Sequence, residues 1–193
     1  KHMKIEADYL VMGSGVAGLF FAIKAAKHGS VAVVTKRERS ESNTQYAQGG
    51  IAAVIDEHDS FASHVEDTLL AGDGLCDQTI VEAVVSEGPE VVRELLAIGA
   101  VFNHEQTGEL ALGREGGHAH ARVVHADDTT GREVIRALVR AVEGLPQVAF
   151  YDHHLAIDLI VDKARRCHGA WVLDTQTGAT IEARASTTLL ATG

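Results

Sequence analysis

The sequence has 193 residues, of which 46% are hydrophobic, so it is long enough to bury the core of one large domain. Its net charge of −10 at pH 7 argues against nucleic acid or an anionic membrane surface as the main partner. No apolar run approaches the ~20 residues of a membrane span and no signal peptide is evident, so we expect a cytoplasmic protein without a membrane partner. The two cysteines, Cys76 and Cys167, match no metal or redox spacing, and we expect reduced thiols and no metal site. Lys1-His2-Met3 looks like a vector remnant.

A strand, a helix and a second strand open the chain. The apolar run at residues 7–12 predicts the first strand, and the pattern at 16–28 predicts a helix that ends at Gly29. The fully apolar segment at 31–35 is typical of a strand in a parallel sheet. This order of elements predicts a βαβ unit.

Gly-Ser-Gly-Val-Ala-Gly at 13–18 lies between the first strand and the helix, and is a Gly-x-Gly-x-x-Gly motif in the context where it binds dinucleotides. Gly13 permits the tight turn, Gly15 lets a pyrophosphate approach the backbone, and Gly18 lets the helix pack closely on the strand. The N-terminus of the helix favours phosphate as well. The alternative is a glycine-rich turn that binds nothing, and the motif alone does not choose between NAD and FAD.

Lys36 stands near the end of the second strand, where a dinucleotide site often has an acid that binds a ribose hydroxyl. A cation at this position favours a contact with phosphate or carboxylate. The alternative is a solvated charge cluster that Lys36 forms with Arg37, Glu38 and Arg39.

A polar segment at 40–48 leads through Gly49 and Gly50 into an apolar run at 51–54, which predicts a buried strand. The glycine pair allows a close approach of the backbone to a ligand. A generic loop would explain the polar half, but it would not explain the direct step into an apolar strand.

The middle of the chain predicts structure rather than chemistry. We expect helices at 60–72 and 77–98, the second interrupted near the Gly-Pro pair at 88–89 and started by a capping box of Thr79 and Glu82. A short strand at 101–102 and a turn at 106–109 follow.

The segment at 114–122 combines two glycines with charged and imidazole side chains. Such a segment suits the lining of an active site, where glycines admit a ligand and cations bind carboxylates. An exposed hairpin with a chance pair of histidines would explain it equally well. The next helix opens within 125–133, with Thr130 and Glu133 as a second capping box, and runs to about residue 143.

Strand patterns fill the rest of the chain. We expect strands at 148–151, 155–161, 169–173, 179–185 and 187–193. The fold class is therefore α/β: a Rossmann-like domain with a parallel sheet and an inserted β-hairpin or meander.

Six segments together resemble the succinate dehydrogenase/fumarate reductase flavoprotein superfamily, and within it the L-aspartate oxidase family. They are Gly-Ser-Gly-Val-Ala-Gly at 13–18, Thr-Lys at 35–36, Asn-Thr-Gln-Tyr-Ala-Gln-Gly-Gly-Ile-Ala-Ala-Val at 43–54, Ser-His-Val-Glu-Asp-Thr-Leu-Leu-Ala-Gly at 63–72, Arg-Glu-Gly-Gly-His at 114–118, and Val-His-Ala-Asp with Thr-Gly-Arg-Glu at 124–133. The likeness runs from about residue 7 to residue 193, and it implies one FAD-binding domain over residues 1–193.

The resemblance implies FAD as the cofactor. Its binding residues would be Gly13, Ser14, Gly15, Val16, Ala17, Gly18, Lys36, Asn43, Thr44, Gln45, Tyr46, Ala47, Gln48, Gly49, Gly50 and Ala156. Asn43 stands where membrane-bound succinate dehydrogenases carry the histidine that attaches FAD covalently, so the FAD here should be non-covalent. The strand end at 191–193 should return to the cofactor.

The resemblance further implies oxidation of L-aspartate to iminoaspartate, the first step of NAD biosynthesis, with fumarate or dioxygen as electron acceptor and quinolinate synthase as a possible partner. Glu115 would orient the substrate by recognising its ammonium. His118, His120, Arg122, His125 and Arg132 are candidates for the lining of the site. The catalytic arginine of the family is expected after Gly193, so this chain should be inactive alone. The alternatives are a succinate dehydrogenase or fumarate reductase type of flavoprotein, and a dinucleotide-binding module without turnover.

Overall fold

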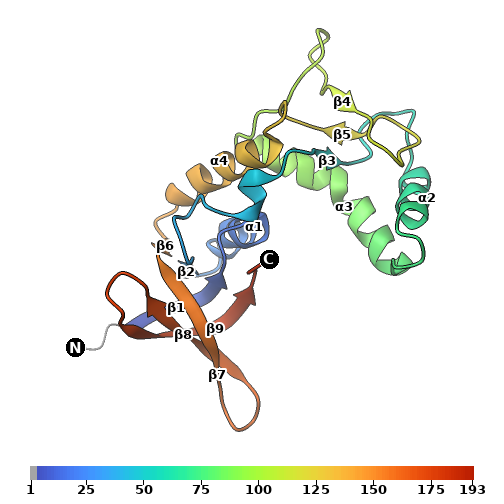
Figure 1. Ribbon diagram of the computed structural model, residues 1–193. Coiled ribbons are helices and arrows are strands. Elements are labelled where there is room, and N and C mark those ends of the chain that lie inside the picture. The colour runs from blue at the N-terminus through green and yellow to red at the C-terminus, as the bar shows by residue number, and fades with distance from the viewer. Residues whose placement is uncertain (1–3) are drawn as a thin grey trace. The chain divides into compact units, whose positions relative to one another are not determined.

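The computed structural model describes residues 4–193, which fall into two compact parts (Figure 1). The first part contains residues up to 46 together with 134–193, and the second contains residues 47–133. Over the described residues, no helix is both long and apolar enough to cross a membrane.

The first part is built on a six-stranded sheet in the order β6-β2-β1-β9-β8-β7. Its elements are β1 (Lys4–Met12), α1 (Val16–Ala25), β2 (Val31–Val34), the 3-10 turn η1 (Asn43–Tyr46), β6 (Val148–Tyr151), β7 (His154–Val161), β8 (Cys167–Asp174) and β9 (Thr180–Leu190). The helix α4 (Thr130–Glu143) begins in the second part and continues in the first from residue 134. Strands β6, β2, β1 and β9 are parallel, whereas β7, β8 and β9 form an antiparallel meander. The α/β prediction with a parallel sheet and a meander is therefore confirmed.

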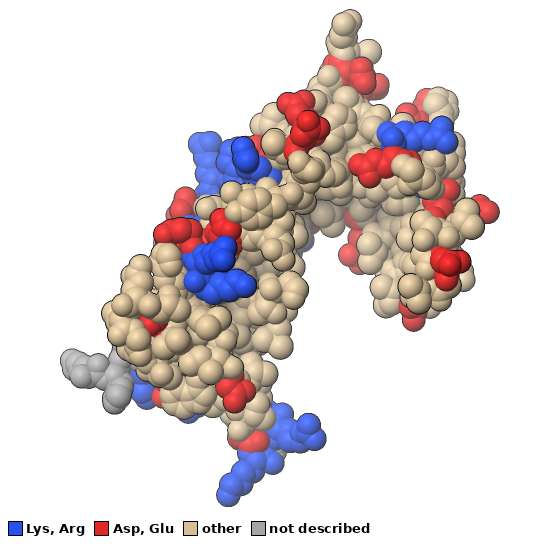
Figure 2. Space-filling model, viewed as in Figure 1, with Lys and Arg blue, Asp and Glu red and all other residues tan. Residues whose placement is uncertain are grey.

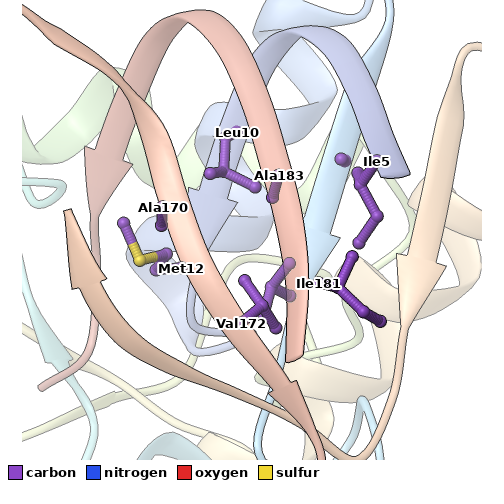
Figure 3. Close-up of a cluster of buried hydrophobic side chains, with 9 residues drawn as sticks. Ile5, Leu10, Met12, Ala170, Val172, Ile181 and Ala183 are labelled. Atoms are coloured by element: carbon purple, nitrogen blue, oxygen red, sulfur yellow. The ribbon is translucent and has the colours of Figure 1, made fainter. Parts of the chain in front are cut away.

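Apolar side chains explain why the central strands form. All four residues of β2 are buried, as a strand covered on both faces requires. One core cluster unites Leu10 and Met12 of β1 with Val172 of β8 and Ile181 of β9 (Figure 3). The meander therefore curls over one face of the parallel strands and buries it.

The helix α1 ends before the residue that the sequence suggested. It stops at Ala25, and Gly29 does not adopt the positive φ of a helix-terminating glycine, so that prediction is wrong. A Cβ at Gly29 would lie 2.5 Å from Asp8 Oδ2. The Asp8 carboxylate accepts hydrogen bonds from the Ser30 N–H at 2.7 Å and its hydroxyl at 2.8 Å. Glycine at position 29 therefore makes room for this contact between the start of β2 and β1.

The β7–β8 hairpin ends in a basic tip of Lys163, Arg165 and Arg166, where blue side chains gather in Figure 2. The Asp162 carboxylate accepts from the Arg166 N–H at 2.9 Å and lies 2.9 Å from His168 Nε2. The His168 contact, followed by the Arg166 amide, lowers the pKa of Asp162 to about 2. These local contacts fix the turn between the two strands.

The second part combines a small sheet with two helices. Its elements are β3 (Ile51–Ala52), α2 (Phe61–Ala71), α3 (Gln78–Ala97), β4 (Leu112–Gly113) and β5 (Val123–Val124). The sheet is antiparallel in the order β3-β5-β4. The Ser60 side chain caps α2 by accepting from the Ser63 N–H, and the Asp77 side chain caps α3 by accepting from the Ile80 N–H.

Both predicted capping boxes are wrong. Thr79 lies inside α3 because Asp77 takes the cap position. Thr130 accepts from the Ala126 N–H, and the Glu133 carboxylate accepts from the Val101 N–H at 2.6 Å instead of returning to its own helix. Each box was proposed from spacing alone, and spacing does not exclude a stronger acceptor nearby.

Three further expectations about this part are corrected. The helix α3 continues through Pro89, whose side chain is buried with Val92 and Leu95 on one face, so packing outweighs the lost backbone hydrogen bond. Residues 101–102 form no strand, although Phe102 is buried. The apolar run at 51–54 yields only the two-residue β3, which is half-buried.

Candidate functional site

The parallel strands of the first part end together. Met12 at the end of β1 lies in register with Val34 of β2 on one side and with Leu190 of β9 on the other. The Gly13 N–H donates to the Val34 carbonyl at 2.9 Å, and the Ala191 N–H donates to the Met12 carbonyl at 2.9 Å. The chain leaves β1 and passes through α1 to β2 on one side of β1, whereas β9 lies on the other side of β1. Such a switch point at the carboxyl ends of parallel strands is where open α/β sheets bind ligands.

A cavity of about 460 Å³ lies at these strand ends, entirely within the first part. It is lined by Met12, Gly13, Ser14, Gly15, Val34, Thr35, Lys36, Arg37, Glu41, Ser42, Asn43, Thr44, Tyr46, His154, Leu155, Ala156, Ala191, Thr192 and Gly193. The volume falls within the range of small-molecule sites.

The three glycines of the motif have different reasons to be glycine. Gly13 has a φ of +110°, and a Cβ there would overlap the Ala191 carbonyl oxygen. A Cβ at Gly18 would overlap the Gly13 carbonyl oxygen, so the strand and the helix could not pack as they do. A Cβ at Gly15 would meet only Thr44 Oγ1, at 3.5 Å. The fold therefore requires Gly13 and Gly18, but it has room for a Cβ at Gly15, on the wall of the cavity.

The N-terminus of α1 begins at this same wall. Gly15 is its N-cap residue and offers no side-chain cap, while the Val16 N–H donates to Thr44 Oγ1 at 3.2 Å. The buried Ser14 hydroxyl donates to Thr35 Oγ1 at 3.1 Å and so joins the first two strand ends. A helix N-terminus that faces a cavity favours an anionic group there.

The rim of the cavity carries two cations and one carboxylate that is held by neighbouring side chains. Lys36 and Arg37 line it from the end of β2. Glu41 Oε1 accepts from the Tyr46 hydroxyl at 2.8 Å and lies 3.2 Å from Arg37 NH1. The hydrogen bond to Glu41 raises the pKa of the Tyr46 phenol, so this phenol stays protonated and holds the acid in place.

Arg39 anchors the segment that forms this rim. Its guanidinium donates to Asp152 Oδ2 at 2.7 and 3.0 Å, lies 3.2 Å from Glu143 Oε1, and covers the Phe150 ring at 4.3 Å from the centroid. The Asp152 hydrogen bond raises the pKa of Arg39, although partial burial opposes it. The rim is therefore fixed to the end of β6, far away in the sequence.

Two buried polar atoms at the cavity find no hydrogen-bond partner among the described residues: Ser42 Oγ and His154 Nε2. His154 Nδ1 lies 2.6 Å from the Asp152 carbonyl oxygen, which can only accept, so Nδ1 carries the proton. In the neutral imidazole, His154 Nε2 is then an acceptor for which no donor lies among the described residues. Buried polar groups are rarely left without a partner, so a polar ligand in this cavity would fit both atoms.

The structure brings half of the predicted cofactor residues to this cavity. Gly13, Ser14, Gly15, Lys36, Asn43, Thr44, Tyr46 and Ala156 line it. Val16, Ala17, Gly18 and Gln45 lie beside it in the first part, whereas Ala47, Gln48, Gly49 and Gly50 belong to the second part. Residues 191–193 also line the cavity, and their contact with the cofactor stays a prediction.

Sequence reasoning missed several residues of the lining. They are Met12, Val34, Thr35, Arg37, Glu41, Ser42, His154 and Leu155. The strand-end residues could have been found, because the ends of adjacent parallel strands must meet. Nothing local to the turn between β6 and β7 indicates His154.

The second part brings the predicted substrate residue Glu115 next to the glycine pair. A Cβ at Gly49 would lie 3.7 Å from Glu115 Oε1, and both residues are exposed. A Cβ at Gly50 would overlap Val123 Cγ1 and the Val124 carbonyl oxygen, so this glycine lets the chain lie against β5. Glu115 belongs to the loop of residues 114–122 that connects β4 to β5.

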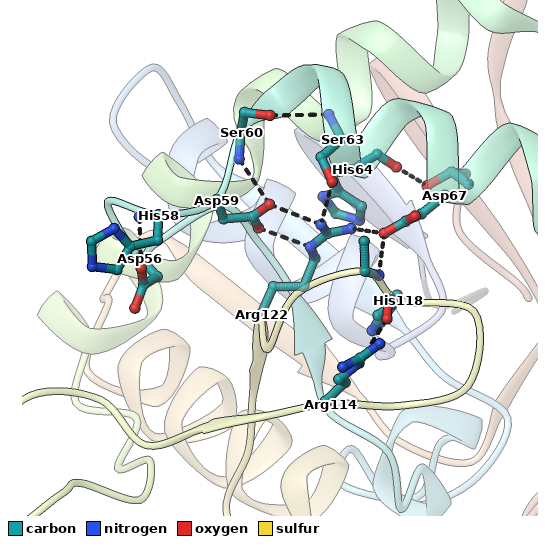
Figure 4. A network of polar contacts seen from close by, with 12 residues as sticks. Asp56, His58, Asp59, Ser60, Ser63, His64, Asp67, Arg114, His118 and Arg122 are labelled. Atoms are coloured by element: carbon teal, nitrogen blue, oxygen red, sulfur yellow. Dashed lines mark hydrogen bonds and ion pairs between the residues drawn. The ribbon is translucent and has the colours of Figure 1, made fainter.

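Arg122 closes that loop and is fully buried (Figure 4). It donates to both Asp59 carboxylate oxygens at 2.8 Å, to Asp67 Oδ2 at 2.7 Å and to Ser63 Oγ at 3.2 Å. Burial alone would raise the pKa of Asp59, yet the Arg122 hydrogen bonds and the Ser60 amide hold it below its usual value. These contacts give Arg122 a structural role, and its place in a ligand site stays a prediction.

The other candidates of the second part lie at different places. The His64 ring, which is 7% exposed, meets the His118 ring edge to face at 6.2 Å between centroids. His125 lies 3.6 Å from a Cβ built on Gly113. His120 is half-buried and Arg132 is exposed on α4. Of these four candidates, only His118 has a described ring contact, and that contact is with His64.

Comparison with known proteins adds three findings. A family model described as "FAD binding domain" matches residues 8–193. L-aspartate oxidase 2-a, chloroplastic, of Nicotiana tabacum is 50% identical over 189 residues, which cover 96% of this chain and 29% of that protein. L-aspartate oxidase 1 of Ralstonia nicotianae is 44% identical over 193 residues, which cover 96% of this chain and 36% of that protein.

Among solved structures, E. coli quinol fumarate reductase FrdA with the E245Q mutation superposes with a TM-score of 0.94 at 32% identity, over 99% of this chain and 33% of that one. The chain thus spans between 29% and 36% of the length of these relatives.

Proposed function

This chain belongs to the FAD binding domain family, and we propose that FAD lies in the cavity of the first part with its pyrophosphate at Gly15 and the N-terminus of α1. The observation that carries this proposal is that the fold has room for a Cβ at Gly15. The fold would accept a side chain there, so the absence of one is explained by a ligand that needs the room.

The remaining wall fits the other groups of the cofactor. Lys36 and Arg37 supply positive charge for the pyrophosphate, and His154 Nε2 supplies an acceptor for a ribose hydroxyl or an amino group. The backbone beside Ala156 lies on the same wall and would contact the adenine end. When bound, FAD supplies a two-electron oxidation, while the protein binds, orients and shields the substrate.

We propose that the FAD is held without a covalent bond. Asn43 lines the cavity, and a carboxamide is not a nucleophile that forms such a bond with flavin. Non-covalent contacts would then supply the affinity for the cofactor.

For the whole protein that contains this segment, we propose the oxidation of L-aspartate to iminoaspartate, the first step of NAD biosynthesis. In that reaction the substrate would give up two electrons and two protons, FAD would supply the two-electron oxidation, and dioxygen or fumarate would be the final electron acceptor. Glu115 supports this choice because it is an exposed carboxylate beside Gly49, and a carboxylate attracts the ammonium that distinguishes L-aspartate from succinate. Quinolinate synthase as a partner and a cytoplasmic location remain predictions, and the plant relatives are named chloroplastic.

A second candidate is a flavoprotein of the succinate dehydrogenase or fumarate reductase type, which the superposition on FrdA favours. Asn43 and Glu115 argue against it, because the first lacks the nucleophile for covalent attachment and the second would repel a dicarboxylate without an amine.

The test is anaerobic reduction of the flavin in the full-length protein. Excess L-aspartate should bleach the flavin absorbance, whereas succinate at the same concentration should not. Bleaching by succinate and not by L-aspartate would replace the first proposal with the second.

A further inference from the structure

We infer that Asp67 is a positioning residue for the loop that carries Glu115, and that it thereby contributes to the selection of dicarboxylates that bear an amine. This inference rests on the proposed function. Asp67 lies on α2, whereas Glu115 belongs to the β4–β5 connection, so the two residues act together only through the contacts between these segments.

One carboxylate oxygen makes both contacts. Asp67 Oδ2 accepts the Ala119 backbone N–H at 2.7 Å and Arg122 NH1 at 2.7 Å (Figure 4). The Ala119 amide is the main cause that holds the pKa of Asp67 below its usual value, with the Arg122 hydrogen bond adding to it. Asp67 therefore stays ionised at neutral pH and holds the loop by a charge-assisted hydrogen bond.

The loop needs such an anchor because its own sequence allows many backbone conformations. Gly116 and Gly117 are exposed, Gly117 has a φ of +86°, and a Cβ at Gly116 would meet nothing within 4 Å. Glycines lose more conformational freedom on ordering than other residues, so contacts elsewhere must offset this cost.

The turn around Glu115 is closed on itself. Arg114 Nε donates to the His118 carbonyl oxygen at 2.8 Å, and the His118 N–H donates to the Glu115 carbonyl oxygen at 3.2 Å. The segment from Arg114 to His118 should therefore move as one piece. The bond from Ala119 to Asp67 connects this piece to α2 and sets where the Glu115 carboxylate lies.

The location of that carboxylate is sensitive to small shifts. Glu115 Oε1 lies 3.7 Å from the Cβ position of Gly49, in the segment that we expect to hold FAD. Groups that bind or react must be placed to well within about 1 Å, because a displacement of that size loses contacts. A loop released from Asp67 would weaken the contact to an ammonium without removing Glu115 itself.

The cluster offers a matched pair of variants. Asp67→Asn leaves Arg122 paired through two hydrogen bonds with Asp59, so no buried charge loses its partner. Asp59→Asn removes the same charge from the same guanidinium, but among the described hydrogen bonds Asp59 accepts from the loop only through the Arg122 side chain and not from the Ala119 backbone, and His120 acts on it only through its charge. Side chains of Asp59 and Asp67 are 1% and 14% exposed, so the control is the more buried of the two.

The experiment compares the dissociation constants of L-aspartate and succinate in the full-length holoenzyme, read from the flavin spectrum. Asp67→Asn should weaken the binding of L-aspartate about tenfold relative to the binding of succinate. This change corresponds to the loss of one charge-assisted contact. Asp59→Asn should lower the melting temperature and leave the ratio within about twofold of the parent. An unchanged ratio in Asp67→Asn, or equal changes in both variants, would overturn the inference.

Hydrogen exchange at the Ala119 amide supplies a second readout that does not depend on the substrate. Exchange should accelerate in Asp67→Asn and remain close to the parent in Asp59→Asn. If the parent protein shows no preference for L-aspartate, the proposed function fails, and exchange alone decides whether Asp67 holds the loop. Unaltered exchange at Ala119 in Asp67→Asn would refute that role.

Discussion

The backbone carbonyl oxygen of Gly13 occupies the space that a side chain at Gly18 would need. This relationship fixes the distance between the end of β1 and helix α1, and it makes Gly18 a requirement of packing. Gly15 lies between these two residues and has no such requirement, with a φ of −72° that any residue adopts. The motif thus separates into glycines that serve the fold and one that is open to a ligand.

Gly15→Val should abolish FAD binding and keep the fold. The side chain would fill the space that we assign to the pyrophosphate, and loss of several phosphate contacts corresponds to an affinity lower by more than about a hundredfold. Titration of the chain with FAD, followed by quenching of flavin fluorescence, measures this. Native affinity in Gly15→Val would show that the pyrophosphate lies elsewhere.

Gly18→Ala is the matched control for that variant. Its Cβ would overlap the Gly13 carbonyl oxygen, so the helix must shift, and the melting temperature should fall in the absence of FAD. Gly15→Val should melt close to the parent under the same conditions. The opposite order of melting temperatures would contradict the division of roles among the glycines.

Flavin bound to the protein should be released by acid. We expect Asn43 at the position of covalent attachment, and a carboxamide forms no such bond, so denaturation should leave nothing to retain the cofactor. After acid precipitation, flavin absorbance should appear in the supernatant, and the pellet should be colourless. A yellow pellet with a fluorescent band on a denaturing gel would mean that another side chain forms the bond.

Local sequence was sufficient for the order of elements around the glycine motif, because continuous apolar runs flank the three glycines, although it placed the end of α1 too late. It was insufficient for the cavity wall, which depends on contacts such as that of Arg39 with Asp152, 113 residues apart. Pro89 shows the same limit, since only the buried face of α3 explains why the helix continues.

Arg122 shows why composition cannot assign a site. The segment at 114–122 left a ligand site and an exposed hairpin as equal alternatives. The guanidinium instead lies buried against Asp59 and Asp67, which are 63 and 55 residues away in the sequence. Neither acid is conspicuous in its own segment, so no local pattern could have paired them.

Glu115→Gln in the full-length enzyme should reduce selection of L-aspartate over dicarboxylates without an amine. Loss of a charge-assisted contact typically costs about 1.5–3 kcal/mol, or roughly ten- to a hundredfold in kcat/KM for L-aspartate. Binding of succinate should change less or improve, because a repulsive charge is removed. Equal losses for both ligands would mean that Glu115 acts on the loop structure and not on the ammonium.

The stability of the protein should fall as the pH drops through the ordinary pKa of histidine, and His64 should cause part of the loss. Burial is the main reason that the pKa of His64 is lowered, and the adjacent Arg122 charge adds to it. Asp59 and Asp67 oppose this shift, and His118 adds to it. The folded state therefore favours the neutral imidazole. Below about pH 6.5 the unfolded chain binds a proton that the folded chain does not, until the lowered pKa is reached.

His64→Gln tests this dependence, because it keeps a polar group near the position of Nε2 and removes the titration. Thermal or denaturant unfolding of the chain at about pH 7.5 and about pH 5.5, on either side of the ordinary histidine pKa, measures the loss. The parent should lose more stability than His64→Gln. The difference between the two can reach at most about 1.4 kcal/mol per pH unit, and solvent screening makes it smaller. His118→Gln keeps the buried His64 imidazole and serves as control, so the pH dependence caused by His64 should persist in it. Identical pH profiles for the parent and His64→Gln would show that His64 is protonated equally in the folded and unfolded states.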